Sequence, residues 1–162
     1  GISHFEEPCP YWEHNQTKEV KEALLLDVAG GEQDCDMSTW KSTIEKQIVN
    51  IVQPDIMYMG GLSRTLDVAR MADNESLPCT PHAANLSLVT ICTMHFLTAI
   101  PNAGKYLELS IEDETYYPWQ QNIFSRNPFK VKDGFVNVED EPGWGVEINP
   151  SWLEKSEYRI SE

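Results

Sequence analysis

The chain has 162 residues, 41% hydrophobic and 10% aromatic, which is enough apolar material for a folded core and argues against wholesale disorder. Its 26 acidic and 12 basic residues give a formal net charge of −14. This charge argues against nucleic acid or an anionic membrane as a partner, because both bind basic surfaces. No apolar run approaches the roughly 20 residues of a membrane span, so the cytoplasm is the expected compartment.

The sequence divides into two regions, strand–helix units over 1–111 and a loop, hairpin and tail over 112–162. In the first region, short apolar segments alternate with amphipathic helical patterns. Strands are predicted at 2–5, 27–31, 50–53, 77–80 and 106–110, and helices at 15–26, 38–49, 62–73 and 86–100. Strands separated by helical crossovers pair in parallel, so the pattern predicts an α/β sheet or barrel.

The second region contains a hairpin signal. Asp133-Gly134 lies between the alternating segments 129–132 and 135–138, and this dipeptide is typical of a two-residue β-hairpin turn. A turn and a closing strand are expected over 141–148.

A potential metal ligand or proton-transferring residue accompanies each predicted strand. These residues recur every 23 to 27 positions, at Glu6, Glu32, Asp55, His82 and Glu108. Because this interval is the length of one strand–helix unit, we expect the five side chains at the same end of a sheet or barrel, where barrel active sites lie. Carboxylates on neighbouring strand ends suit a hard cation such as Mg²⁺. An Asp beside a His can orient the imidazole as a general acid or base.

Each residue also has an ordinary structural explanation. Glu6 could be a solvated loop carboxylate, and Glu32 could cap a helix. Asp55 could be a turn residue, His82 a structural histidine, and Glu108 the partner of a nearby lysine. It is much less expected that five unrelated residues of these types would all fall at the same point of successive strand–helix units than that they share one site. The pattern therefore favours the functional interpretation.

The strings that contain these residues also resemble a known family. They are Phe5-Glu6-Glu7-Pro8, Ala29-Gly30-Gly31-Glu32, Gln53-Pro54-Asp55, Pro81-His82, Tyr106-Leu107-Glu108 and the segment 133–148. In this order they resemble the mandelate racemase and muconate lactonizing group of the enolase superfamily. The resemblance implies an α/β fold, the C-terminal portion of a TIM-like (β/α)7β barrel with a C-terminal β-hairpin extension. The tail would return toward an N-terminal capping domain.

The resemblance also implies a role for each side chain. Glu6 and Glu32 would be two of three Mg²⁺ ligands. His82, oriented by Asp55, would be the general acid or base. Glu108 would hydrogen-bond the enolate oxygen or the carboxylate as charge develops. The reaction would begin with abstraction of the proton next to a carboxylate, with the metal stabilising the enediolate.

We therefore expect an acid-sugar dehydratase, a Mg²⁺-dependent lyase acting on a small carboxylate. A racemase or epimerase of the same superfamily is the alternative, and the two differ in whether a second base faces His82.

The third ligand, a catalytic lysine and the capping domain have no counterpart in the sequence, so a complementary N-terminal portion is expected as a partner. An incomplete fragment that serves in assembly is an alternative of another class. A symmetric homo-oligomer is also expected.

Overall fold

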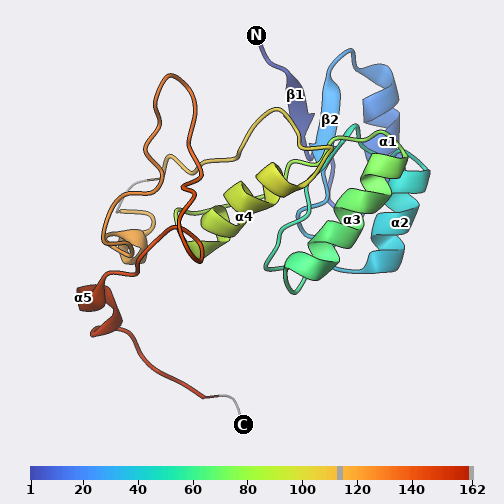
Figure 1. Cartoon of the computed structure of the whole chain (residues 1–162). Helices are drawn as coiled ribbons and strands as arrows, with labels where there is room; N and C mark the ends of the chain where they lie inside the picture. The colour runs from blue at the N-terminus through green and yellow to red at the C-terminus, as the bar shows by residue number, and fades with distance from the viewer. Residues whose placement is uncertain (113–114, 161–162) are drawn as a thin grey trace.

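A small parallel sheet forms the N-terminal part of the molecule (Figure 1), seen in a computed structural model that describes residues 1–112 and 115–160. The strands lie in the order β1 His4–Glu6, β2 Asp27–Gly30 and β3 Ile51–Val52. In the register of this sheet Glu6 lies opposite Ala29, and Gly30 lies opposite Val52. The carboxyl ends of the strands therefore lie at one edge, as the alternating pattern predicted.

Two isolated parallel bridges extend the series beyond β3. Val52 pairs with Cys79, and Cys79 pairs with Ala103. The strand predicted at 77–80 is therefore reduced to one bridging residue, Cys79. The strand predicted at 106–110 is wrong, because those residues have no strand conformation and the pairing falls earlier in the chain.

A close backbone approach at Gly104 explains this shift. The N–H of Gly104 donates to the carbonyl of Cys79 at 2.8 Å, and the N–H of Cys79 donates to the carbonyl of Asn102 at 2.8 Å. A Cβ at position 104 would collide with the Thr80 hydroxyl. Only glycine permits this approach, so the glycine and its neighbours supply the fifth parallel segment.

The predicted helices are confirmed, with ends that differ by a few residues. They are α1 His14–Ala23, α2 Met37–Glu45, α3 Leu62–Asn74 and α4 Leu88–Ala99. Asp36 caps α2, because its side chain accepts the N–H of Thr39 at 2.8 Å. Over residues 1–112 and 115–160, no helix has the length and apolar character needed to cross a membrane.

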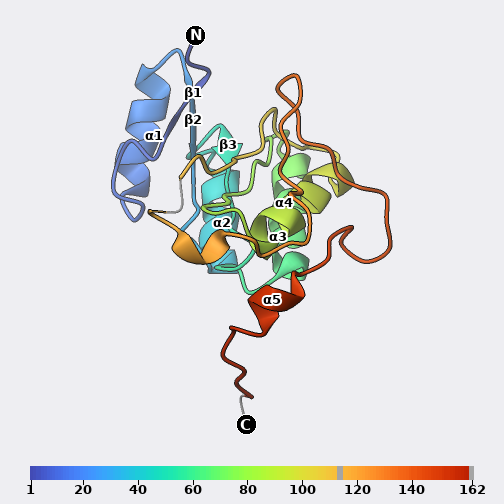
Figure 2. The same ribbon diagram turned by 90° about the vertical axis from the view of Figure 1, so that its left-hand side faces the viewer.

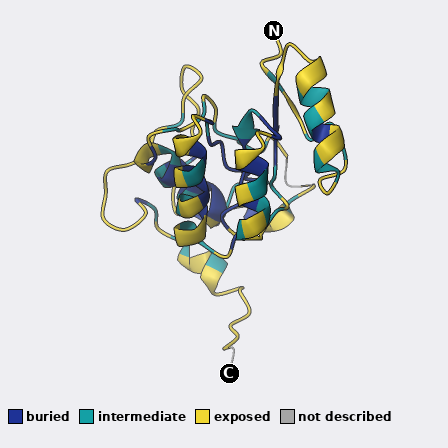
Figure 3. Cartoon of the chain, turned by 90° about the vertical axis from the view of Figure 1, so that its right-hand side faces the viewer, coloured by how far each residue is buried: buried dark blue, intermediate teal, exposed yellow. Residues whose placement is uncertain are grey.

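The main core lies between the strands and the helices α2, α3 and α4. Exposed residues cover the outer faces of the helices, and buried residues face inward (Figure 3). Trp40 of α2 is fully buried, and its Nε1 donates to the carbonyl of Asp34 at 2.9 Å. Around it are buried the apolar residues Val28, Ile44, Ile48, Val52, Met59, Val68, Phe96 and Ile100.

A second apolar cluster joins the tail to α4. Ile91 and Met94 of α4 pack with Ile123, Phe124 and Phe129 of the tail. The tail also contains the 3₁₀ helix η1 Pro118–Gln120 and the short helix α5 Pro150–Leu153. Trp152 of α5 packs against this cluster, and residues 154–160 after α5 extend away from the rest of the chain (Figure 2).

The hairpin predicted in the tail is present only as its turn. Asp133 and Gly134 have φ values of 53° and 83°, as a two-residue hairpin turn requires. Lys132 and Phe135 exchange N–H···O bonds of 2.8 and 2.9 Å. The predicted arms beyond them are not strands, and the closing strand expected near Ile148 is one antiparallel bridge. An isolated two-stranded ribbon is marginally stable at best, and Phe135 beside the turn is 73% exposed.

Replacing Gly104 with Ala tests the contact that sets the fifth segment. The added Cβ meets Thr80, so we expect a loss of about 1–3 kcal/mol in the free energy of unfolding. The midpoint of thermal unfolding measures it, and a Thr80→Ala change in the same background should restore part of the loss. An unchanged midpoint for Gly104→Ala would contradict this packing.

Candidate functional site

The predicted site residues follow the parallel segments at their carboxyl ends. Glu6 ends β1, and Glu32 and Asp55 follow β2 and β3. His82 and Glu108 come shortly after the two bridged segments. Because the segments are parallel, these residues emerge at the same edge, which is where parallel α/β proteins build their sites.

Asp55 and His82 form a buried hydrogen-bonded pair. Asp55 Oδ2 lies 2.8 Å from His82 Nδ1, and the two residues are only 4% and 7% exposed. The other oxygen, Asp55 Oδ1, accepts the N–H groups of Met57 at 2.7 Å and Tyr58 at 2.8 Å. One carboxylate oxygen thus fixes the turn after β3, and the other fixes the imidazole ring.

The second nitrogen of His82 faces a carboxylate on the neighbouring strand end. His82 Nε2 lies 3.4 Å from Glu32 Oε2. The hydrogen bond to Asp55 raises the pKa of His82, and although burial acts to lower it, the pKa reaches about 9. The negative charges of Glu108 and Glu32 also raise it. The imidazole is therefore a cation at neutral pH in the metal-free protein.

The carboxylates around His82 have pKa values shifted in opposite directions. Burial acts to raise the pKa of Asp55, but the hydrogen bonds from His82 and from the two backbone N–H groups outweigh it and lower the pKa. Burial raises the pKa of Glu32; the charge of His82 opposes this, whereas Glu7, Glu6 and Glu108 add to it. Glu32 therefore sits in an excess of negative charge.

Glu108 is fixed beside the histidine through the backbone. Its Oε2 accepts the N–H of Ala83 at 2.8 Å. The structure therefore brings Glu108 to the same edge as His82 and Glu32, although residues 106–110, predicted as a strand, do not form one. The order of segments, rather than strand conformation at 106–110, is what places it there.

The carboxylates supply oxygen donors of the kind that a hard cation prefers. Glu6 is exposed at the end of β1, and its charge acts on Glu32, the other expected ligand. Within the described part of the chain, no three His, Cys, Asp or Glu side chains are arranged to hold a metal ion. Two carboxylates on neighbouring strand ends are oxygen donors of the kind that Mg²⁺ prefers, but they are fewer than the octahedral set of ligands it usually takes.

Two residues near this edge were not singled out from the sequence. The Tyr58 ring is stacked near His82, with centroids 6.1 Å apart and planes tilted by 28°. Burial raises the pKa of Glu7, and Glu6 adds to this, whereas the backbone N–H of Gly31 opposes it. The turn expected after Pro54-Asp55 could have placed Tyr58 near the site. Nothing in the sequence pattern, however, distinguishes a role for Glu7 from that of the adjacent Glu6.

Comparison with known proteins identifies the family. The model of the enolase C-terminal domain-like family matches residues 1–152. The chain belongs to this family. The resemblance to the mandelate racemase and muconate lactonizing group is thereby confirmed, and the fold is that of the enolase C-terminal domain with a partial parallel sheet.

Solved structures of this group superpose on the chain closely. A protein from Roseobacter denitrificans, described provisionally as a racemase, is 60% identical with a TM-score of 0.96, over 100% of this chain and 44% of that one. A mandelate racemase/muconate lactonizing protein from Paracoccus denitrificans, complexed with magnesium, is 28% identical with a TM-score of 0.83, over 95% of this chain and 40% of that one.

Curated relatives are enzymes of several kinds. D-galactarolactone cycloisomerase of Agrobacterium fabrum is 28% identical over 100% of this chain and 43% of its own length. D-xylonate dehydratase of Haloferax volcanii is 25% identical over 89% of this chain and 34% of its own length. The chain thus spans less than half the length of these relatives, which are acid-sugar dehydratases and cycloisomerases of the enolase superfamily.

Replacing Asp55 with Asn should lower the pKa of His82 in the metal-free protein from about 9 toward its ordinary value of 6.5. The amide removes the charged partner, while its oxygen can still accept the N–H groups of Met57 and Tyr58. NMR titration of the imidazole measures the change, and equal pKa values in both proteins would contradict it.

The same shift predicts a pH dependence of stability. A raised histidine pKa stabilises the folded state fully below the unfolded value of 6.5, and this contribution disappears as the pH rises through about 9. Thermal unfolding of the metal-free protein should therefore show a smaller difference between the parent and Asp55→Asn above pH 9 than at pH 6. A difference independent of pH would show that the lost charge is not its cause.

Proposed function

We propose that the complete protein is a Mg²⁺-dependent acid-sugar dehydratase. It would remove the proton next to the substrate carboxylate and expel the hydroxyl on the following carbon, giving a 2-keto-3-deoxy acid. The observation that carries the proposal is the buried Asp55–His82 pair, 2.8 Å apart, facing a strand-end carboxylate. The dehydratases among the relatives support the choice of reaction.

His82 is the group proposed to move the proton. Asp55 engages Nδ1, so Nε2 is the nitrogen directed toward the other carboxylates and toward a substrate bound among them. In its neutral form His82 would take the proton from the carbon, and in its cationic form it would give a proton to the departing hydroxyl. Asp55 would keep the imidazole in the required tautomer and orientation.

Glu6 and Glu32 are proposed as the Mg²⁺ ligands from this chain. Both are carboxylates at neighbouring strand ends, and the charge of Glu6 contributes to the raised pKa of Glu32. A bound Mg²⁺ would supply Lewis-acid stabilisation of the enediolate charge. Glu108, whose Oε2 accepts the N–H of Ala83 at 2.8 Å, would donate a hydrogen bond through a carboxylic acid O–H to the developing oxyanion or the substrate carboxylate.

A racemase or epimerase is the second candidate. The Asp55–His82 pair serves either reaction, and the racemase description of the Roseobacter denitrificans relative, 60% identical, favours this alternative. A second base facing His82 would return a proton to the opposite face of the substrate. Deuterium incorporation with inversion would identify a racemase, and loss of water would identify a dehydratase.

We further propose that the site is completed by an N-terminal portion of the same protein. The chain covers 44% of the Roseobacter denitrificans protein and 43% of the Agrobacterium fabrum enzyme. Strand β1 is the edge of the sheet, and it is free to pair with further strands of a (β/α)7β barrel. Residues 1–111 would be the C-terminal units of that barrel, and 112–162 the segment returning to a capping domain.

Replacing His82 with Asn in the complete protein should reduce turnover by roughly 10²–10⁴-fold while Mg²⁺ still binds. The reason is that the amide cannot exchange protons, whereas neither proposed metal ligand is altered. Formation of 2-keto-3-deoxy acids from a panel of aldonic and aldaric acids measures turnover, and calorimetry measures Mg²⁺ binding.

The matched control is His95→Asn. His95 lies on α4, and its Nε2 contacts the carbonyl of Trp144 at 3.1 Å, away from the strand ends. We expect this variant to keep parental turnover. Parental activity in His82→Asn would remove His82 from the mechanism, and equal losses in both variants would indicate a general effect on folding.

A further inference from the structure

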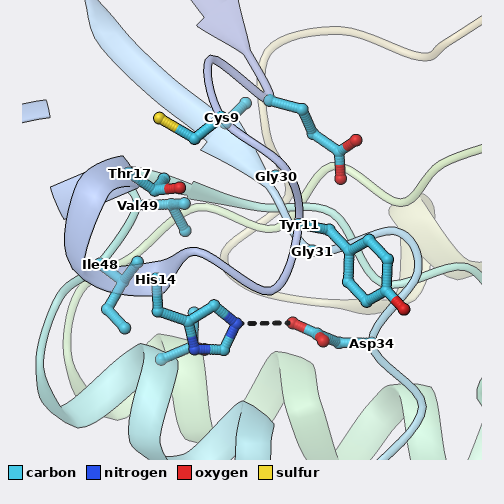
Figure 4. A pocket seen from close by; sticks show the side chains of 12 residues that line it. Cys9, Tyr11, His14, Thr17, Gly30, Gly31, Asp34, Ile48 and Val49 are labelled. Atoms are coloured by element: carbon cyan, nitrogen blue, oxygen red, sulfur yellow. Dashed lines mark ion pairs between the residues drawn. The ribbon is translucent and has the colours of Figure 1, made fainter. Parts of the chain in front are cut away.

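A small cavity lies behind the carboxyl ends of β1 and β2. Its volume is about 20 Å³, and residues from the ends of both strands, α1 and α2 line it. Figure 4 shows the His14 imidazole turned toward Asp34 on one side, with His14 Nε2 and Asp34 Oδ2 3.8 Å apart. All residues that line it lie between Glu7 and Val49, so this region of the chain forms its walls.

Two polar atoms of the lining are buried without a hydrogen-bond partner. They are Glu7 Oε1 and Thr43 Oγ1, neither of which is bonded to any described residue. Thr43 is only 3% exposed. Leaving a carboxylate oxygen and a hydroxyl unpaired is unfavourable, and buried polar groups are normally paired with protein or with ordered water.

Glu7 is also tied to both strand ends that carry the proposed metal ligands. It directly follows Glu6, and its N–H donates to the carbonyl of Ala29 at 3.0 Å. Its backbone has a φ of 39°, which is uncommon for a residue with a side chain. Its Cγ would lie 3.5 Å from a Cβ at Gly30, so the side chain packs closely behind β2.

We propose that this cavity binds one water molecule bridging Glu7 Oε1 and Thr43 Oγ1, and that this bridge positions Glu6 and Glu32. A volume of about 20 Å³ matches a single water, which needs about 10–15 Å³ and two to four polar partners. The water donates one hydrogen bond to the Glu7 carboxylate and forms a second hydrogen bond with the Thr43 hydroxyl, which can either donate or accept. Through it, α2 holds Glu7, and Glu7 holds the end of β1 against β2.

Glu7 and Thr43 are thus positioning residues, and this part of the inference rests on the proposed function. Groups that orient metal ligands from behind typically change metal affinity by about 10–100-fold when they are removed. The water site itself requires only the cavity and the two unpaired atoms.

Thr43→Val in the complete protein separates a hydrated cavity from a dry one. If the cavity is dry, removing an unpaired hydroxyl leaves the thermal midpoint unchanged or raises it. If water bridges the two atoms, the midpoint falls without Mg²⁺ or substrate, and the Kd for Mg²⁺ rises by about 10-fold. Thr43→Ser keeps the hydroxyl and should retain the parental Kd.

Thr93→Val is the matched control for metal binding. Thr93 is also buried, but its hydroxyl donates within α4 to the carbonyl of Val89 at 2.9 Å. We expect it to leave the Kd for Mg²⁺ unchanged. Glu6→Gln is titrated in parallel, so that a failure of the proposed metal site is distinguished from a failure of this inference.

The outcomes separate the two parts of the proposal. An unchanged or higher midpoint for Thr43→Val overturns the water site. A lower midpoint with an unchanged Kd, while Glu6→Gln weakens Mg²⁺ binding, supports the water but overturns its positioning role. A crystal structure of the complete protein with water within hydrogen-bond distance of both atoms supports the site directly, and an empty cavity overturns it.

Discussion

Glu6 of β1 lies opposite Ala29 of β2, and Gly30 of β2 lies opposite Val52 of β3. This parallel register decides where each segment ends, and so where the side chains that follow emerge. A shift of one residue would turn Glu6 to the other face of the sheet, because side chains alternate along a strand. The inner faces of the helices pack behind these short strands and form the main core, which includes the fully buried Trp40.

The same register gathers negative charge at one edge. Glu6, Glu7 and Glu108 all act to raise the pKa of Glu32, and His82 is the cation that opposes them. Holding several carboxylates together is unfavourable for folding unless cations compensate. His82 provides part of this compensation, and the proposed Mg²⁺ would provide more. Bringing these carboxylates together thus lowers stability locally at the edge where the proposed site lies.

Much of this arrangement could be predicted from the sequence, since α1, α2 and α3 have 3.6-residue amphipathic patterns, α4 is a long apolar segment, and the site residues recur at similar intervals. The Asp55–His82 pair followed from strand order alone, because consecutive parallel segments lie side by side. The pairing at Ala103 could not be predicted, because it depends on the close approach of Gly104 to Thr80. The predicted hairpin arms were wrong because the turn signal is local, and two strands alone form at best a marginally stable ribbon.

The most direct test of the account is the fate of the hydrogen next to the substrate carboxylate. Acid sugars deuterated at that carbon are incubated with the complete protein, and release of deuterium into water is followed. We expect release that requires both Mg²⁺ and His82, whether the product is a dehydrated acid or an epimer. Turnover with deuterium retained on the carbon skeleton, or release that persists after Mg²⁺ is chelated, would contradict it.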